Sequence, residues 1–345
     1  MTTILIVDDS DTARATLRQV LEADADCRVV GEASTGEQAL RFVDDHDPDI
    51  VIMDVFLRRE NGVDVTASIM SKAPRPVFIL TGADATDPAL VYRAMEAGAL
   101  EVSAKLPSPR HPCYKARREQ LVRRVKALAD VPVVHRFCRQ VKRAAQPRSQ
   151  YTSNSRCAEL VVVAASTGGP PVVHQLLNQL ESPFPLPIAI VQHIAEGFTE
   201  SFLAWLRQVT SHSIAKVAHT MPLEPGTVYF PASDRHLKLA SRVTVTSSGE
   251  PPRNYQRPSA DVLIESAVAH VGAAAIGVIL TGMGSDGAQG LAALRRAGGF
   301  TIAQAPETCA VGSMPEQAIA AGAIDLVASP ETIAPEIERR VTGGR

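Results

Sequence analysis

The stretch VVVAASTGGP, residues 161–170, decides which fold the second half of the chain is expected to adopt. Its first five residues are apolar, and Ser166 then opens a Thr-Gly-Gly-Pro turn. A short apolar run bounded by glycine and proline is typical of a strand that is buried on both faces. The two glycines could serve only to form a tight turn after the strand. The alternative is that this turn also presents the Ser166 hydroxyl for chemistry.

Similar apolar runs recur on both sides of this stretch and alternate with helical patterns. In the second half, the expected core strands are residues 159–166, 187–194, 274–282, 300–304 and 323–329. In the first 107 residues, the expected strands are residues 3–7, 28–33, 49–55, 76–82 and 101–105, with helical spacing in residues 13–23 and 36–45. Apolar strands that alternate with helices predict parallel sheets covered on both faces. Residues 226–246 interrupt this alternation and predict antiparallel hairpins.

The chain is therefore expected to form two α/β domains joined by a linker. We assign residues 1–130 to a doubly wound domain with a five-stranded parallel sheet, residues 131–156 to the linker, and residues 157–345 to a second doubly wound domain with a β-hairpin excursion. Between Arg110 and Arg156 the chain has 13 Lys and Arg against two acidic residues. This excess of basic residues is explained if the stretch forms a solvated helix that closes the first domain, followed by a polar tether. The alternative is an electrostatic contact with an acidic partner.

The overall composition is that of a globular protein and argues against several classes. The 345 residues are 45% hydrophobic and 21% charged, and the net charge of −2 gives the chain as a whole no attraction to nucleic acid or membranes. Five cysteines without a C-x-x-C pair argue against a disulfide scaffold or a zinc finger and fit a reducing cytoplasm. The first residues, MTTILIVDDS, lack the basic region of a signal peptide, and no apolar stretch approaches the roughly 20 residues of a membrane span. We expect a cytoplasmic monomer that binds no nucleic acid and does not insert into a membrane.

Five polar side chains follow the expected strands of the first domain: Asp8, Asp9, Asp54, Thr81 and Lys105. Parallel sheets place their functional groups at the carboxyl ends of strands, so these side chains are expected to converge on one edge. Crowded carboxylates need a cation, and their oxygen atoms suit Mg²⁺, next to which a carboxylate can accept a phosphoryl group. The alternative is that the acids cap the following helices, which would account for one or two of them.

These residues resemble the receiver domain of bacterial response regulators, over residues 2–128. The resemblance implies these roles: Asp54 as phosphoacceptor, Asp9 and Asp54 as Mg²⁺ ligands assisted by Asp8, and Thr81 with Lys105 as the signalling pair. Several positions depart from the family pattern, and two of them lie near the signalling lysine. Val102 stands where an aromatic switch residue is usual, and Leu106 separates Lys105 from the proline that normally follows it.

A second group of polar residues follows the expected strands of the second domain: Ser166, His193 and Asp286. A serine hydroxyl is a weak nucleophile at neutral pH, so it needs a base within hydrogen-bond reach, and the base needs a third group that fixes its tautomer. Strand ends of one sheet would bring the three together, and backbone amides near the Gly168-Gly169 turn could hold an oxyanion. The alternatives are helix N-caps for the serine and the aspartate, and a histidine held by the backbone.

A competing motif overlaps this group. Gly282, Gly284 and Gly287 have the G-x-G-x-x-G spacing of a dinucleotide-binding turn, after a strand and before a helix, which would favour a nucleotide-dependent oxidoreductase. The motif lies late in the domain rather than in its first strand–turn–helix unit, and it leaves the serine turn unexplained. A non-enzymatic binding module controlled by phosphorylation is a third possibility.

The second domain resembles the catalytic domain of the chemotaxis protein-glutamate methylesterases. The matching segments are AASTGGP, VQHI, EPGTVYFPASDRHL, RPSADVL, GVILTGMGSDGAQGL and GSMPEQA, and they cover nearly all of residues 158–338 in order. Together with the receiver and the linker, the resemblance extends to the whole of a response-regulator methylesterase.

This resemblance implies Ser166 as the nucleophile, His193 as the general base, Asp286 as its orienting partner and the Met283 amide as an oxyanion donor. The implied substrate is the methyl ester of glutamate side chains on methyl-accepting chemoreceptors, with deamidation of glutamine as a second reaction and no cofactor for either. A chemotaxis histidine kinase would be the phosphodonor. Phosphorylation of Asp54 would relieve inhibition by the receiver, which in this family covers the catalytic face.

Overall fold

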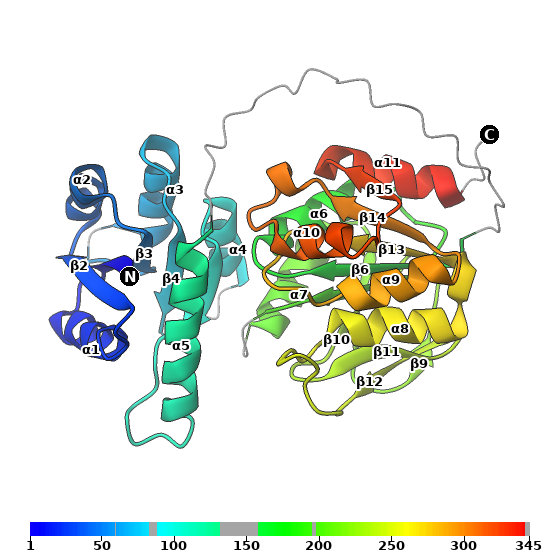
Figure 1. The fold of residues 1–345 in the computed structure, drawn as a ribbon, viewed down its shortest axis with the longest axis horizontal. Coiled ribbons are helices and arrows are strands. Elements are labelled where there is room, and N and C mark those ends of the chain that lie inside the picture. Colours follow the sequence, from blue (N-terminus) through cyan, green and yellow to red (C-terminus); the bar gives the residue numbers. More distant parts are fainter. Residues whose placement is uncertain (59, 83–87, 132–157, 195–197, 342–345) are drawn as a thin grey trace.

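The computed structural model describes residues 1–58, 60–82, 88–131, 158–194 and 198–341. Within these residues the chain forms two α/β units that lie side by side (Figure 1). The first unit ends with helix α5 (Tyr114–Ala129), and the second begins with strand β6 (Leu160–Ala165). Residues 132–156 of the expected linker lie outside the described residues, so the domain boundaries stay a prediction.

The first unit contains the five-stranded parallel sheet that the sequence predicts. Its strands are β1 (Thr2–Val7), β2 (Cys27–Ala33), β3 (Ile50–Asp54), β4 (Val77–Thr81) and β5 (Glu101–Ala104), in the order β2-β1-β3-β4-β5. Every residue of β3 and β4 is buried, as expected for central strands of a sheet covered on both faces. The carboxyl ends of β1, β3, β4 and β5 therefore share one edge.

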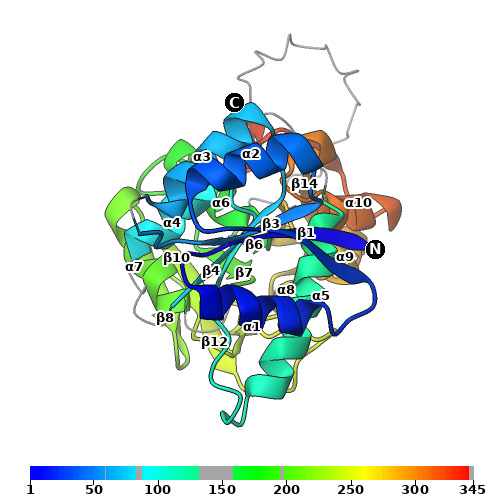
Figure 2. The ribbon, with the colours of Figure 1, turned by 90° about the vertical axis from the view of Figure 1, so that its left-hand side faces the viewer.

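Helices cover both faces of this sheet (Figure 2). Helices α1 (Asp11–Leu21) and α5 pack on one face, and α2 (Gly36–His46), α3 (Gly62–Lys72) and α4 (Pro88–Glu96) pack on the other. Helix α1 begins after Ser10, whose side chain accepts a hydrogen bond from the Ala13 amide, and Thr35 caps α2 through the Gln38 amide. These caps fix the loops that follow β1 and β2.

The second unit contains a seven-stranded parallel sheet in the order β15-β14-β13-β6-β7-β10-β8. Besides β6, its strands are β7 (Ile188–Gln192), β8 (Ser213–Val217), β10 (Thr227–Pro231), β13 (Ala275–Ile279), β14 (Phe300–Gln304) and β15 (Leu326–Ala328). One face is covered by α6 (Gly169–Gln179), α7 (Thr199–Val209) and α11 (Pro330–Val341), and the other by α8 (Ala260–His270), α9 (Ala288–Arg296) and α10 (Ser313–Ala320). The doubly wound fold expected from the sequence is confirmed.

The prediction of antiparallel hairpins in residues 226–246 is wrong in part. Strand β10 runs parallel to its neighbours β7 and β8, inside the main sheet. Its sequence, TVYFP, is buried almost throughout, which is the pattern of a parallel strand covered on both faces rather than of a half-exposed hairpin. The antiparallel excursion is confined to β11 (His236–Ser241) and β12 (Thr244–Ser248), with the short strand β9 (Met221–Pro222) beside β12.

Two short 3-10 helices, η1 (Gly272–Ala274) and η2 (Pro306–Thr308), complete the elements of the described residues. Among the helices of this part of the chain, none is both long enough and apolar enough to cross a lipid bilayer.

The two units are in contact through the side of the first unit that carries α4 and β5. Phe198, just before α7, is 8% exposed and packs into an apolar cluster of the first unit that includes Met95. On the other face of the first sheet, Val311 of the second unit packs into a cluster that also takes in Leu106 and Met283. The first unit therefore lies against the loops at the carboxyl edge of the second sheet.

Candidate functional site

Ser166 lies where the sequence predicts it, in the turn between β6 and α6, and is only 3% exposed. The N-cap residue of α6 is Gly168, with φ at 73°, so Ser166 does not cap this helix. A methyl group at Gly169 would overlap the side-chain amide of Gln192, and the glycine is therefore needed for the close approach of α6 to β7. Both glycines of the turn thus have a local structural reason.

His193 follows β7, the strand next to β6 in the sheet. Ala165 pairs with Gln192 in parallel register, so Ser166 and His193 occupy neighbouring positions just beyond the two strands, and both line one small cavity. The His193 Nε2 atom lies 2.9 Å from Asp286 Oδ2, and Nδ1 is buried without a hydrogen-bond partner among the described residues. Because the carboxylate fixes the proton on Nε2, Nδ1 is the ring nitrogen available to take a proton.

The prediction that Asp286 directly follows a strand is wrong. Strand β13 ends at Ile279, and Asp286 lies further on, in the loop before α9. The sheet order explains this position, because β6 separates β13 from β7 and places them about 10 Å apart. A residue directly after β13 would lie beside Ser166, whereas the longer loop carries Asp286 across to His193.

The Asp286 carboxylate is held at the N-terminus of helix α8. It accepts hydrogen bonds from Ser259 Oγ at 2.7 Å, the Ala260 amide at 2.6 Å and the Asp261 amide at 3.1 Å, besides the contact with His193. Burial would raise the pKa of Asp286, but the hydrogen bond and charge interaction with His193, followed by the bonds from Ala260 and Ser259, outweigh burial and lower the pKa below its ordinary value. The group is therefore an anion that fixes the histidine, and it caps α8 rather than the helix that follows it.

Sequence reasoning missed the residues that support Asp286. His236 is fully buried, its Nδ1 accepts the Ser259 amide at 3.1 Å, and its Nε2 lies 3.1 Å from the Pro251 carbonyl oxygen. These partners require a neutral imidazole. The signal available in the sequence was the serine of RPSADVL, which directly precedes an apolar helical run as an N-cap residue does.

The loop after β13 also brings Met283 toward Ser166. Gly282 packs against the Ser166 Cβ atom, where a side chain would not fit. The amides of Gly282 and Gly284 are bonded to the Val311 carbonyl and the Ser313 hydroxyl, whereas the Met283 amide has no partner within the described part of the chain. Close packing thus explains the first glycine of the G-x-G-x-x-G spacing without a bound nucleotide.

In the first unit, the structure brings together all five residues expected at the sheet edge. One carboxylate oxygen each from Asp8, Asp9 and Asp54 lies within 4.8 Å of the others. Lys105 Nζ lies 2.7 Å from both Asp8 Oδ2 and Asp54 Oδ2. Burial raises the pKa of Asp54 despite the hydrogen bond from Lys105. The Oδ1 atom of Asp54 and the hydroxyl of Thr81 are buried without hydrogen-bond partners among the described residues, so a divalent cation and a phosphoryl group fit this pocket.

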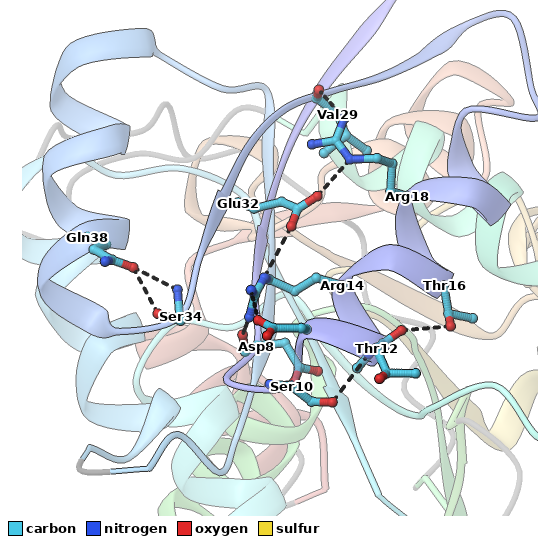
Figure 3. Close-up of polar contacts among 12 residues, drawn as sticks. Asp8, Ser10, Thr12, Arg14, Thr16, Arg18, Val29, Glu32, Ser34 and Gln38 are labelled. Carbon is cyan, nitrogen blue, oxygen red and sulfur yellow. Dashed lines mark hydrogen bonds and ion pairs between the residues drawn. The ribbon is translucent and has the colours of Figure 1, made fainter.

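Arginine side chains of α1 brace the strand end that carries these acids (Figure 3). Arg14 Nη1 donates to the Asp8 carbonyl oxygen at 2.6 Å, and Arg14 also pairs with Asp11 and Glu32. Arg18 Nε lies 2.6 Å from the same Glu32 carboxylate. These contacts hold β1, α1 and β2 together behind the acidic pocket.

The first unit closes over Ser166 and His193. The small cavity that they line, about 60 Å³, has walls from both units. The first unit contributes Val91, Met95, Leu100, Glu101, Val102 and Arg124. Arg124 Nε lies 3.0 Å from Glu101 Oε1, and burial raises the pKa of Glu101 in spite of this ion pair. The sequence patterns gave no sign of this pair.

Comparison with protein families matches two models to the chain. The CheB methylesterase model matches residues 161–337, and the response regulator receiver domain model matches residues 4–111. The methylesterase match spans the second unit from β6 into α11, and the receiver match spans the first unit from β1 to the loop before α5.

Curated relatives match almost end to end. A protein-glutamate methylesterase/protein-glutamine glutaminase of Anaeromyxobacter dehalogenans is 40% identical over 97% of both chains, and one of Syntrophus aciditrophicus is 38% identical over 97% of both. Among solved structures, the CheB methylesterase catalytic domain of Thermotoga maritima is similar with a TM-score of 0.51 and 32% identity, covering 53% of this chain and 98% of that one.

Proposed function

The chain belongs to the CheB methylesterase family, with a response regulator receiver domain in front of the methylesterase domain, and we propose that it hydrolyses glutamate methyl esters on methyl-accepting chemoreceptors. The observation that carries this proposal is the joint placement of Ser166, His193 and Asp286. We assign the receiver to residues 1–130, the linker to 131–156 and the catalytic domain to 157–345.

The proposed reaction is acyl transfer. Ser166 Oγ attacks the γ-carbonyl carbon while His193 Nδ1 takes the hydroxyl proton, and Asp286 stabilises the imidazolium through Nε2. The Met283 amide donates to the oxyanion. The carbon–oxygen bond to the methoxy group then breaks, and His193 returns the proton so that methanol leaves. Water, deprotonated by His193, releases glutamate and restores the Ser166 hydroxyl. A glutamine side chain would react in the same way with ammonia as the leaving group.

The receiver is proposed to regulate this reaction through phosphorylation of Asp54. Asp8, Asp9 and Asp54 would hold Mg²⁺, which would neutralise charge on the phosphoryl group during its transfer from a chemotaxis histidine kinase. Lys105 and the Thr81 hydroxyl would contact the new phosphoryl oxygens, and this would draw Lys105 away from Asp8.

The closed contact between the units supports inhibition in the unphosphorylated state. Ser166 is 3% exposed, and the cavity beside it is far too small for a polypeptide substrate. Access requires α4 and β5 of the receiver to move off the catalytic domain. Phosphorylation at the carboxyl ends of β3, β4 and β5 would shift this equilibrium.

Mass spectrometry of receptor helices tests the proposed function directly. Incubation with the wild-type chain is expected to remove methyl groups from glutamate esters and to release methanol in equal amount. Esters that stay intact in the presence of acetyl phosphate would refute the proposed activity. Tight binding of a nicotinamide cofactor by the chain would instead favour the oxidoreductase alternative.

Asp54→Ala is expected to keep the basal rate of methanol release and to lose stimulation by acetyl phosphate and Mg²⁺. In the wild-type chain we expect stimulation on the order of tenfold, the size of a typical allosteric coupling. Asp44→Ala, which removes an exposed carboxylate from α2, is the matched control and should respond as the wild type does. A stimulated Asp54→Ala chain would show that the phosphoacceptor is a different residue.

Met95→Ala is expected to raise basal methanol release about fivefold, because it removes apolar contact between α4 and Phe198 and weakens closure. Leu17→Ala is the control, since it truncates a buried side chain of the same domain on α1. Rates without a phosphodonor provide the measurement. If the basal rate rose equally in both variants, the cause would be a less stable receiver and not the lost contact between α4 and Phe198.

A further inference from the structure

A tight turn before helix α8 contains an unusual tyrosine. Asn254 and Tyr255 have φ angles of 50° and 64°, and the flanking residues Arg253 and Gln256 exchange two backbone hydrogen bonds of 3.0 and 2.9 Å. Two central residues with positive φ correspond to a type I′ turn. Asparagine is common at the first of these positions, but the second usually carries glycine, because a side chain there strains the backbone.

Ion pairs brace the turn on both sides. Arg253 Nη2 lies 2.7 Å from Glu265 Oε1 on α8, and Arg257 Nε lies 2.8 Å from Asp234 Oδ1 in the loop after β10. The surroundings therefore hold Tyr255 in its strained conformation, as is typical of strained residues at functional sites.

Folding does not explain why a tyrosine occupies this position. Tyr255 is 100% exposed, so its ring gains nothing from burial, whereas Tyr229, the buried tyrosine of β10, is 1% exposed. A glycine would satisfy the backbone better, and an aspartate or asparagine would be more soluble. The ring has to be explained by something that contacts it from outside.

The turn lies at the rim of the cleft that contains His193. This cleft has a volume of about 700 Å³ and is lined by His193, Pro258 and Tyr255 of the second unit and by Gln120 and Arg123 of the receiver. The chain then enters α8, whose first residues hold Asp286. The cleft shares His193 and Arg124 with the small cavity at Ser166, so a polypeptide that brings a side-chain ester to the serine along this cleft passes close to the turn.

We propose that Tyr255 is a substrate-recognition residue whose ring contacts the chemoreceptor segment next to the methylated glutamate. The inference rests on the proposed function. A tyrosine ring has an apolar face and a polar hydroxyl, which suits a helix surface where apolar and polar groups alternate. The ring adds affinity for the receptor and takes no part in the chemistry at Ser166.

The test compares two substrates of the full chain in the presence of acetyl phosphate and Mg²⁺. For Tyr255→Gly, whose backbone fits the turn without strain, KM for methylated receptor is expected to rise about tenfold with kcat within twofold. Hydrolysis of p-nitrophenyl acetate, too small to reach the turn from Ser166, should stay within twofold. Tyr255→Phe should restore most of the receptor affinity. Val243→Ala, at an exposed apolar residue of the β11–β12 turn, is the matched control and should leave both substrates unaffected.

Three results would overturn the role of Tyr255 while wild-type activity on the receptor stands. The first is an unchanged KM of Tyr255→Gly for receptor. The second is an equal loss of hydrolysis rate with receptor and with p-nitrophenyl acetate. The third is a higher rate of receptor hydrolysis without phosphodonor at constant KM. The last would show that Tyr255 affects closure by the receiver and not substrate binding. If the wild-type chain hydrolysed the small ester but released no methanol from receptor, the proposed function itself would fail, and the substrate role with it.

Discussion

Ser166→Ala is expected to lower kcat for methanol release by a factor of about 10⁴ or more. The variant keeps the cavity and the His193–Asp286 pair, but it has no oxygen with which to form the acyl-enzyme. The measurement is methanol released from methylated receptor by the full chain with acetyl phosphate present, so that closure by the receiver does not limit either protein. The residual rate reports what binding and the oxyanion amide achieve without a nucleophile.

The chemical role of this serine can be separated from effects on folding. A fluorophosphonate probe should label Ser166 in the wild-type chain, faster with acetyl phosphate than without it, and should leave Ser166→Ala unlabelled. Ser211→Ala, at an exposed serine of the same domain, is the control and should keep both labelling and turnover. Turnover by Ser166→Ala within tenfold of the wild type would contradict the acyl-enzyme mechanism.

The placement of the site was predictable from the sequence wherever a strand end determines it. Ser166, His193, Asp54 and Thr81 directly follow or end buried parallel strands, and the shared edge of a parallel sheet brings such residues together. Asp286 was predicted as a member of the group, but its position in a long loop was not. The reason is that the sequence does not reveal strand order, and only the order β13-β6-β7 requires a loop that crosses β6.

The supporting residues could not be predicted because their partners are distant in sequence. His236 reaches Asp286 only through Ser259, and the Arg124–Glu101 pair closes between two elements of the receiver at a surface that belongs to both units. Neither arrangement produces a local pattern. A buried histidine with two backbone partners has the same sequence signature as an exposed one.

The two departures from the receiver pattern acquire a structural meaning from the closed contact. Val102 lines the cavity beside Ser166, and Leu106 belongs to the apolar cluster that includes Val311 and Met283 of the other unit. Both positions therefore lie where the receiver meets the catalytic domain. Small and aliphatic side chains at these two positions allow close packing of the closed state.

Asp286→Asn is expected to lower kcat by about 10⁴-fold, the size of effect seen when a triad carboxylate is neutralised. The amide cannot hold the proton on His193 Nε2 as the carboxylate does, so Nδ1 is no longer fixed as the base. The NH₂ group of the asparagine would also face a hydrogen-bond donor of α8. These donors are the Ser259 hydroxyl and the amides of Ala260 and Asp261, and each of them needs an acceptor. We therefore expect a loss of about 2 kcal/mol in the free energy of unfolding at neutral pH.

This loss of stability should depend on pH with a definite sign. Because the folded-state pKa of Asp286 is lower than its ordinary value, the carboxylate contributes stability above the unfolded pKa, about 3.9, and this contribution is lost as pH falls through the folded pKa. Urea unfolding of the wild type and Asp286→Asn should thus differ fully at pH 7, and the two should begin to converge only as pH falls below about 4. Asp325→Asn is the control for catalysis. It removes a carboxylate that lies away from the cleft and accepts hydrogen bonds from Thr301 and Arg295. This variant should lower the free energy of unfolding but leave kcat within twofold of the wild type. A stability difference that persists unchanged at pH 3 would mean that the charge of Asp286 is not what holds the start of α8, and the loss of kcat would then need another cause.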